Sequence, residues 1–261
     1  MDGAAVAAAI ASSQDELARR LAALSDDELA APSRLPEWDR LTVVCHIRYG
    51  AEAIDRMVRA ALKGEAALFY PGGRAEQRPA TLAPAAGESP RDVVASFGAH
   101  CEQLNDTLAQ VEDWTTEFRE PDGHHDLGPQ TVYQLAVLRL TEVDVHAVDL
   151  DIGIERWSDA FAAVGLPVRI DRLGRTLANN VAGEVITGSW LLRSAEGPAY
   201  LVTRSADAVT KRPARSDESA DGTIDATARD LIALMLGRAF EGDVAYSNDF
   251  ARSFPVAFPG P

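Results

Sequence analysis

Two residues that can bind a metal ion or a proton, Glu142 and His146, stand four residues apart in a stretch with helical periodicity. On a helix, side chains at this spacing lie one turn apart on the same face. That face also carries Leu135, Leu138 and Val145, so an ionisable pair interrupts an apolar stripe. A buried carboxylate is costly unless it is compensated. The pair therefore needs hydrogen bonds, a counter-charge or a bound cation.

Spacing alone leaves these alternatives open. The pattern E-x-x-x-H is common by chance and is often a simple contact between neighbouring turns. Arg139, one turn before Glu142, offers an ion pair that would remove the need for a cation. A third ligand would favour the metal, and His46 is the candidate because small and apolar residues surround it early in another predicted helix. By itself, a single histidine there is more often a hydrogen-bonded core residue.

Helical periodicity of the apolar residues predicts four helices that would position these side chains. Three of these helices begin at a residue that can cap a helix: Thr42, Thr131, and Ser89, which is followed by Pro90 at the first helical position. Residues 70–87 hold three prolines and three glycines and are expected to form a long loop. Four long helices predict a bundle, in which facing side chains build metal sites. The predicted helices span residues 15–24, 42–62, 90–111 and 131–150.

The pattern changes after about residue 151, where a smaller α+β domain is expected. A helix is followed by two strands joined at the turn Glu196-Gly197-Pro198, then by a polar loop, a short strand and a helix. We therefore expect a two-domain α+β protein, with a helical bundle in residues 1–155 and an α+β domain in residues 156–261. In the second domain the helix is predicted over 167–182, the strands over 185–193 and 199–205, and the loop over 212–222.

The segments around the candidate ligands resemble a known family. Leu35-Pro36-Glu37-Trp38 and the residues up to His46 look like the L-P-x-W-x-x-x-x-V-x-x-H opening of the mycothiol-dependent maleylpyruvate isomerase and DinB-like families. Residues 139–150 look like their R-x-x-E-x-x-V-H-x-x-D-L helix. The resemblance implies a DinB-like four-helix bundle in which His46, Glu142 and His146 hold a divalent metal, usually zinc.

A weaker similarity extends into the second half of the chain. Residues 225–238 are similar to the family's second-domain helix, which ends in a leucine-rich G-R. The family's arginine there helps to hold the anionic substrate, and this role would fall on Arg238. The alternative is structural, because the helix dipole favours an arginine at a helix C-terminus.

Two histidines and one carboxylate leave a coordination position open, which is the pattern of a catalytic zinc and not of a closed structural one. An open metal can lower the pKa of a thiol. The resemblance implies that mycothiol is the thiol cosubstrate and that it adds to a cis-alkene diacid such as maleylpyruvate, with rotation and elimination giving the trans isomer. The alternatives are a mycothiol S-transferase acting on another electrophile and a non-catalytic, metal-containing ligand-binding protein.

Composition excludes other classes of protein. The net charge of -15 disfavours a nucleic-acid partner, and no stretch approaches the roughly 20 apolar residues of a membrane span. The apolar stretch from Ala4 to Ala11 follows no positive residue, so no export signal is expected. The two cysteines, Cys45 and Cys101, do not form a disulfide framework. We expect a cytoplasmic protein with a small-molecule substrate, in which Cys45 is a buried structural thiol.

Overall fold

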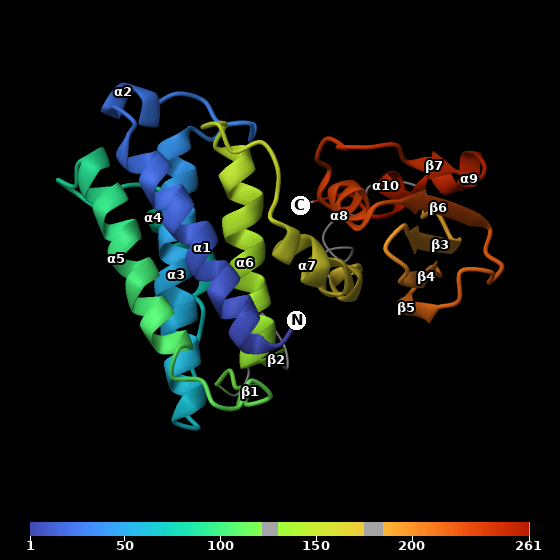
Figure 1. Ribbon diagram of the computed structural model, residues 1–261, viewed down its shortest axis with the longest axis horizontal. Helices are drawn as coiled ribbons and strands as arrows, with labels where there is room; N and C mark the ends of the chain where they lie inside the picture. The colour runs from blue at the N-terminus through green and yellow to red at the C-terminus, as the bar shows by residue number, and fades with distance from the viewer. Residues whose placement is uncertain (122–129, 175–184, 261) are drawn as a thin grey trace. The chain divides into compact units, whose positions relative to one another are not determined.

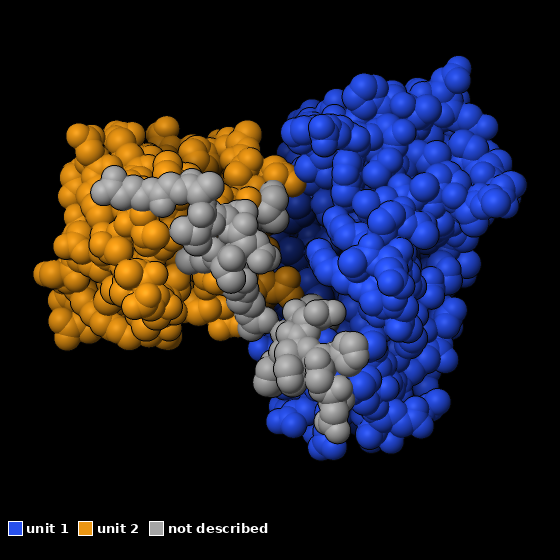
Figure 2. Space-filling view, turned by 180° about the vertical axis from the view of Figure 1, so that it is seen from behind, with its two compact units in different colours: residues 1–161 blue, residues 162–261 orange. Residues whose placement is uncertain are grey.

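The computed structural model describes residues 1–121, 130–174 and 185–260. The chain divides into two compact units, Met1–Phe161 and Ala162–Pro261, which are coloured separately in Figure 2. The first unit is helical and the second is built on a sheet (Figure 1). The expected two-domain α+β fold is therefore confirmed. None of the described helices is long and apolar enough to cross a bilayer.

The first unit contains four long helices: α1 (Gly3–Ala22), α3 (Arg40–Leu62), α5 (Pro90–Leu108) and α6 (Val132–Asp149). They form the predicted bundle, because α1 and α3 each pack against both α5 and α6. Apolar residues at helical spacing fill the interior, as Val6, Ile10, Leu17 and Leu21 do on α1. The neighbouring helices α3 and α6 carry the candidate ligands.

The helix starts agree with the sequence at α5 and α6 but not at α3. Ser89 caps α5 with Pro90 at the first helical position, and Thr131 caps α6, as predicted. The cap of α3 is Asp39, whose carboxylate accepts a hydrogen bond from the backbone N–H of Thr42 at 2.7 Å. A carboxylate satisfies a free N–H of the first turn as well as a hydroxyl does, so α3 begins two residues earlier than expected.

Helix α1 is much longer than the helix predicted over 15–24, because it begins at Gly3. Alanine has the highest intrinsic helix propensity, which favours this start. Val6 and Ile10 continue the buried stripe of Leu17 and Leu21, so the added turns also pack into the core.

Residues 70–87 are not a continuous loop, since they contain the helix α4 (Arg74–Thr81). Pro79 lies inside this helix, and the prolines and glycines around it obscured the helical signal. Tyr49 of α3 anchors the start of this segment: Tyr70 stacks on Tyr49 at 5.2 Å between ring centroids, and the Tyr49 hydroxyl donates to the Phe69 carbonyl at 2.6 Å. The remaining elements of the unit are α2 (Asp26–Leu29) and the antiparallel strands β1 (Glu117–Phe118) and β2 (Gln130–Thr131).

A fully buried arginine on α6 joins the four long helices. Arg139 donates from Nε to Gln14 Oε1 on α1, and from Nη1 to the Ile47 carbonyl on α3, both at 2.7 Å. Its Nη2 donates to the sulfur of Cys101 on α5 at 3.4 Å. Because Ile47 follows His46 in the chain, these bonds also hold the backbone beside a candidate ligand.

The second unit has a mixed five-stranded sheet in the order β5-β4-β3-β6-β7. Its elements are β3 (Gly188–Ser194), β4 (Ala199–Arg204), β5 (Val209–Ala214), β6 (Gly222–Ala226), α8 (Ala228–Leu236), β7 (Ala245–Tyr246), α9 (Asp249–Arg252) and α10 (Phe254–Ala257). The predicted hairpin joins β3 and β4, and β3 also pairs with β6 in parallel. The core centres on Trp190 of β3, whose ring contacts Phe250, Phe254 and Phe258.

Two expectations for this half of the chain were wrong. Helix α7 (Asp159–Arg172) begins eight residues before the predicted start at Pro167, and the Ser158 hydroxyl accepts from the Phe161 N–H. Residues 175–182 of the expected helix lie outside the described part. Strand β5 extends into the predicted loop 212–222. It forms an edge of the sheet, where Pro213 is tolerated because one side of the strand needs no partner.

Candidate metal centre

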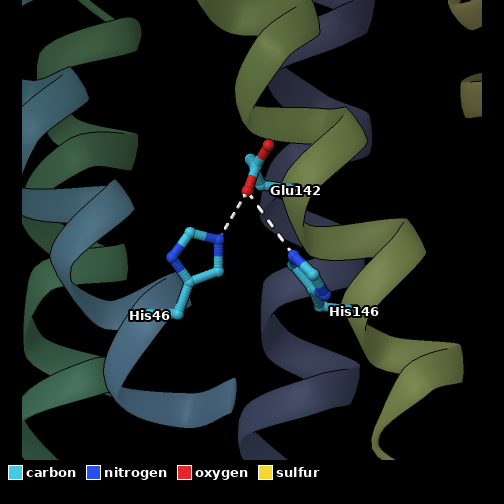
Figure 3. Close-up of side chains that lie close together, drawn as sticks. All are labelled: His46, Glu142 and His146. Carbon is cyan, nitrogen blue, oxygen red and sulfur yellow. Dashed lines mark hydrogen bonds and ion pairs between the residues drawn. The ribbon is translucent and has the colours of Figure 1, made fainter. Parts of the chain in front are cut away.

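The bundle brings His46 of α3 together with Glu142 and His146 of α6 (Figure 3). One atom from each side chain forms a group in which all separations are within 4.8 Å. Glu142 Oε2 lies 3.0 Å from His46 Nε2 and 3.6 Å from His146 Nε2. The three residues proposed from sequence therefore converge, although 96 positions separate His46 from Glu142.

The three side chains are mostly withdrawn from solvent but not sealed. Their exposed fractions are 15% for His46, 29% for Glu142 and 14% for His146. A cluster enclosed on all sides would admit no further ligand, whereas this one keeps an accessible edge. Solvent can therefore reach part of the cluster, mainly at Glu142.

His146 is oriented by a carboxylate of its own helix. Its Nδ1 lies 3.0 Å from Asp149 Oδ2, and the Asp149 side chain is almost completely buried. Burial opposes the charge on His146, but the hydrogen bonds to Asp149 and Glu142 raise its pKa to about 9. An imidazole that donates Nδ1–H to Asp149 presents Nε2 to the cluster, which is the usual support for a metal-ligating histidine.

The carboxyl group of Glu142 is kept ionised by the two histidines. Burial opposes its ionisation, but the hydrogen bonds to His146 and His46 hold its pKa well below the usual range. The proposed ion pair with Arg139 is not what the structure contains, because the guanidinium of Arg139 is engaged by Gln14, Ile47 and Cys101. Arg139 therefore forms no contact ion pair with Glu142 and acts on it only through a longer-range Coulombic interaction.

The donor set of this cluster fits a divalent metal. Zinc binds histidine nitrogen and carboxylate oxygen at about 2.0–2.1 Å, which places the ligand atoms of a tetrahedral site about 3.3 Å apart. The separations of 3.0 and 3.6 Å from Glu142 lie on either side of this value. Two nitrogens and one oxygen leave a tetrahedral ion with one free position.

Trp38 forms one wall beside the cluster, which the sequence motif indicated without assigning it a role. Its ring lies 5.5 Å from the His46 ring, at 71°. The preceding residue, Glu37, has φ of 65°, a left-handed conformation that is uncommon for residues other than glycine. Backbone strain of this kind tends to occur at functional sites. It accompanies the turn that places Trp38 against His46.

Other residues singled out in the sequence have different surroundings. Cys45 is fully buried, and burial raises its pKa to about 11, so this thiol stays protonated at neutral pH. Arg238 belongs to the second unit, where it follows the left-handed Gly237 that ends α8. Its Nη1 donates to the Leu236 carbonyl at 3.0 Å, as expected for an arginine at a helix C-terminus.

Replacing Asp149 with alanine is expected to weaken divalent-metal binding about 10- to 100-fold, because His146 would lose the acceptor that orients its ring. Asp149→Asn keeps an acceptor oxygen and should cost less. Competition with a zinc-binding chelator measures both affinities. Equal affinities for wild type and Asp149→Ala would show that His146 needs no such support.

The fold and the cluster together define the class of protein. It is a four-helix-bundle protein with a candidate metal centre of two histidines and a carboxylate, and an α+β unit follows the bundle in the chain. Residues 10–151, more than half of the chain, match the family model described as the mycothiol maleylpyruvate isomerase N-terminal domain. The chain belongs to the mycothiol maleylpyruvate isomerase family. The family is named for an isomerase, so the chain is an enzyme.

Two solved structures share the fold. They are the crystal structure of the mycothiol-dependent maleylpyruvate isomerase, with a TM-score of 0.65, and that of a variant with one histidine replaced by alanine, with a TM-score of 0.66. Each is 18% identical, and each comparison covers 95% of this chain and 93% of the other. At this identity the likeness establishes the fold. Comparison with curated proteins gave no match.

Proposed function

We propose that this enzyme uses a divalent metal, zinc in the first instance, to activate mycothiol for addition to an electrophilic cis-alkene diacid such as maleylpyruvate. The observation that carries the proposal is the convergence of His46, Glu142 and His146, with their ligand atoms within 4.8 Å of one another. Membership of the family supports mycothiol as the thiol.

Each residue of the cluster has a role in this proposal. His46, Glu142 and His146 hold the metal. When bound, a divalent metal with an open position supplies a Lewis acid that lowers the pKa of a thiol, so that the thiolate is available at neutral pH. Glu142 contributes the negative charge that offsets the ion, and Asp149 orients the imidazole of His146 so that its Nε2 atom is directed at the site.

The reaction is balanced without an added oxidant or reductant. The thiolate sulfur forms a bond to one alkene carbon, and the electron pair of the double bond moves toward the adjacent carbonyl group. Rotation about the new single bond follows. Loss of the same thiolate re-forms the double bond as the trans isomer, so mycothiol is not consumed. In this scheme Arg238, on the second unit, is proposed to hold a substrate carboxylate.

The decisive experiment is a product assay with the purified, zinc-loaded enzyme, mycothiol and maleylpyruvate, followed by NMR. We expect the trans isomer to accumulate with mycothiol in catalytic amount, and no product from chelator-treated enzyme until zinc is restored. If mycothiol is instead consumed one for one into a stable adduct, the enzyme is an S-transferase. If neither product forms although the metal is bound stoichiometrically, a binding protein is the better description and the proposal fails.

A further inference from the structure

Two arginines on α4 are linked to the candidate centre through the aromatic residues Trp38 and Tyr70. Arg74 and Arg78 are four residues apart, so their side chains lie one turn apart on the same face of this helix. Together with Ala75, Pro79 and Leu82 they line a hollow of about 500 Å³. The hollow, the helix α4 and the three candidate ligands all belong to the first compact unit.

Aromatic rings support both guanidinium groups. The Arg78 guanidinium carbon lies 5.9 Å from the centre of the Trp38 ring, and its Nη1 lies 3.5 Å from the Tyr70 hydroxyl. Arg74 lies 5.7 Å from the Tyr70 ring. Within the described part of the chain, neither arginine has an aspartate or glutamate oxygen within the 4.0 Å of an ion pair. The N–H groups of both therefore have no anionic partner there.

Trp38 connects this pair to the centre, because the same ring contacts Arg78 and the imidazole of His46. A second connection runs through Tyr70, which stacks on Tyr49, one turn after His46 on α3. The position of α4 is thus set by the helix that carries a candidate ligand. One aromatic ring is therefore a neighbour of both Arg78 and His46.

We propose that Arg78, assisted by Arg74, binds a carboxylate of the substrate and makes the centre selective for anionic electrophiles. A guanidinium that lies over an aromatic ring can still donate from its N–H edge, and this fork matches a carboxylate with two hydrogen bonds. The protein carries a net charge of -15, so an anionic substrate needs a local basic group to approach the site. The proposal rests on the proposed function for the identity of the substrate.

Binding of maleate tests the assignment without turnover. We expect Arg78→Gln to weaken maleate binding to the zinc-loaded protein about 10- to 100-fold, which is the range for losing a charge-assisted hydrogen-bonded pair. Arg78→Lys should recover part of the affinity, because the charge is kept and the fork is lost. Arg19→Gln, the same change on an exposed residue of α1, is the matched control and should leave binding unchanged. Calorimetry measures all four proteins.

Kinetics separate substrate recognition from a structural role. Arg78→Gln should raise KM for maleylpyruvate while leaving zinc content and the mycothiol conjugation of neutral N-ethylmaleimide within about twofold of wild type. Unchanged maleate binding would overturn the proposal. Loss of zinc, or an equal loss of activity with N-ethylmaleimide, would also overturn it, because either result would mean that Arg78 only supports Trp38. If maleylpyruvate is not isomerised but maleate binding still depends on Arg78, the reaction assignment fails and the anion site stands.

Discussion

Replacing His46 with alanine is expected to lower zinc affinity by more than about 100-fold and to abolish turnover with mycothiol. Loss of a residue that only orients a ligand costs 10- to 100-fold, so loss of a ligand itself should cost more. His46 is also the only member of the cluster that α3 supplies, so the substitution leaves two ligands on one helix. Metal analysis after dialysis, together with the product assay, measures both effects.

His100→Ala is the matched control for this experiment. It makes the same change on α5, at a histidine that is not part of the cluster. The control should retain one zinc per chain and full activity, and the circular dichroism spectra of both variants should match that of wild type. Stoichiometric zinc in a folded His46→Ala protein would refute the metal centre in the form given above.

Arg139→Ala is expected to reduce the free energy of unfolding by about 3–5 kcal/mol, the range for disrupting a buried charged network. The substitution leaves the Oε1 atom of Gln14 without its donor inside the bundle, which costs about 1–3 kcal/mol, and it removes the additional bond that the Ile47 carbonyl accepts. It also opens a cavity where the four long helices meet. Urea denaturation followed by far-UV circular dichroism gives the loss.

Arg34→Ala provides the comparison for Arg139. Arg34 bonds to Asp151 at 2.6 Å, but both side chains are about half exposed. A surface pair of this kind contributes less than about 1 kcal/mol. Zinc affinity adds a second readout, because the Ile47 carbonyl lies next to His46. If Arg139→Ala and Arg34→Ala reduced the free energy of unfolding by similarly small amounts, Arg139 would be dispensable for the stability of the bundle.

The order and type of the elements that carry the candidate ligands could be predicted from local sequence. Apolar periodicity and the caps Ser89 and Thr131 are contained within a few residues, so they are readable without the fold. Elements with weak or contradictory local signals were missed. Helix α4 contains Pro79, and strand β5 contains Pro213, and each is stable because of what it packs or pairs against.

For the site, local spacing was sufficient to predict the types of the three ligands and the shared face of Glu142 and His146, since four residues on a helix always make about one turn. The other features of the site depend on long-range packing. The packing of α3 against α6 brings His46 to Glu142, and the partners of Arg139 on three other helices engage its guanidinium, so that it forms no contact ion pair with Glu142. The place of Arg78 over Trp38 likewise depends on α4 being held by Tyr49 and Tyr70. Such contacts join residues far apart in the chain, and local spacing carries no information about them.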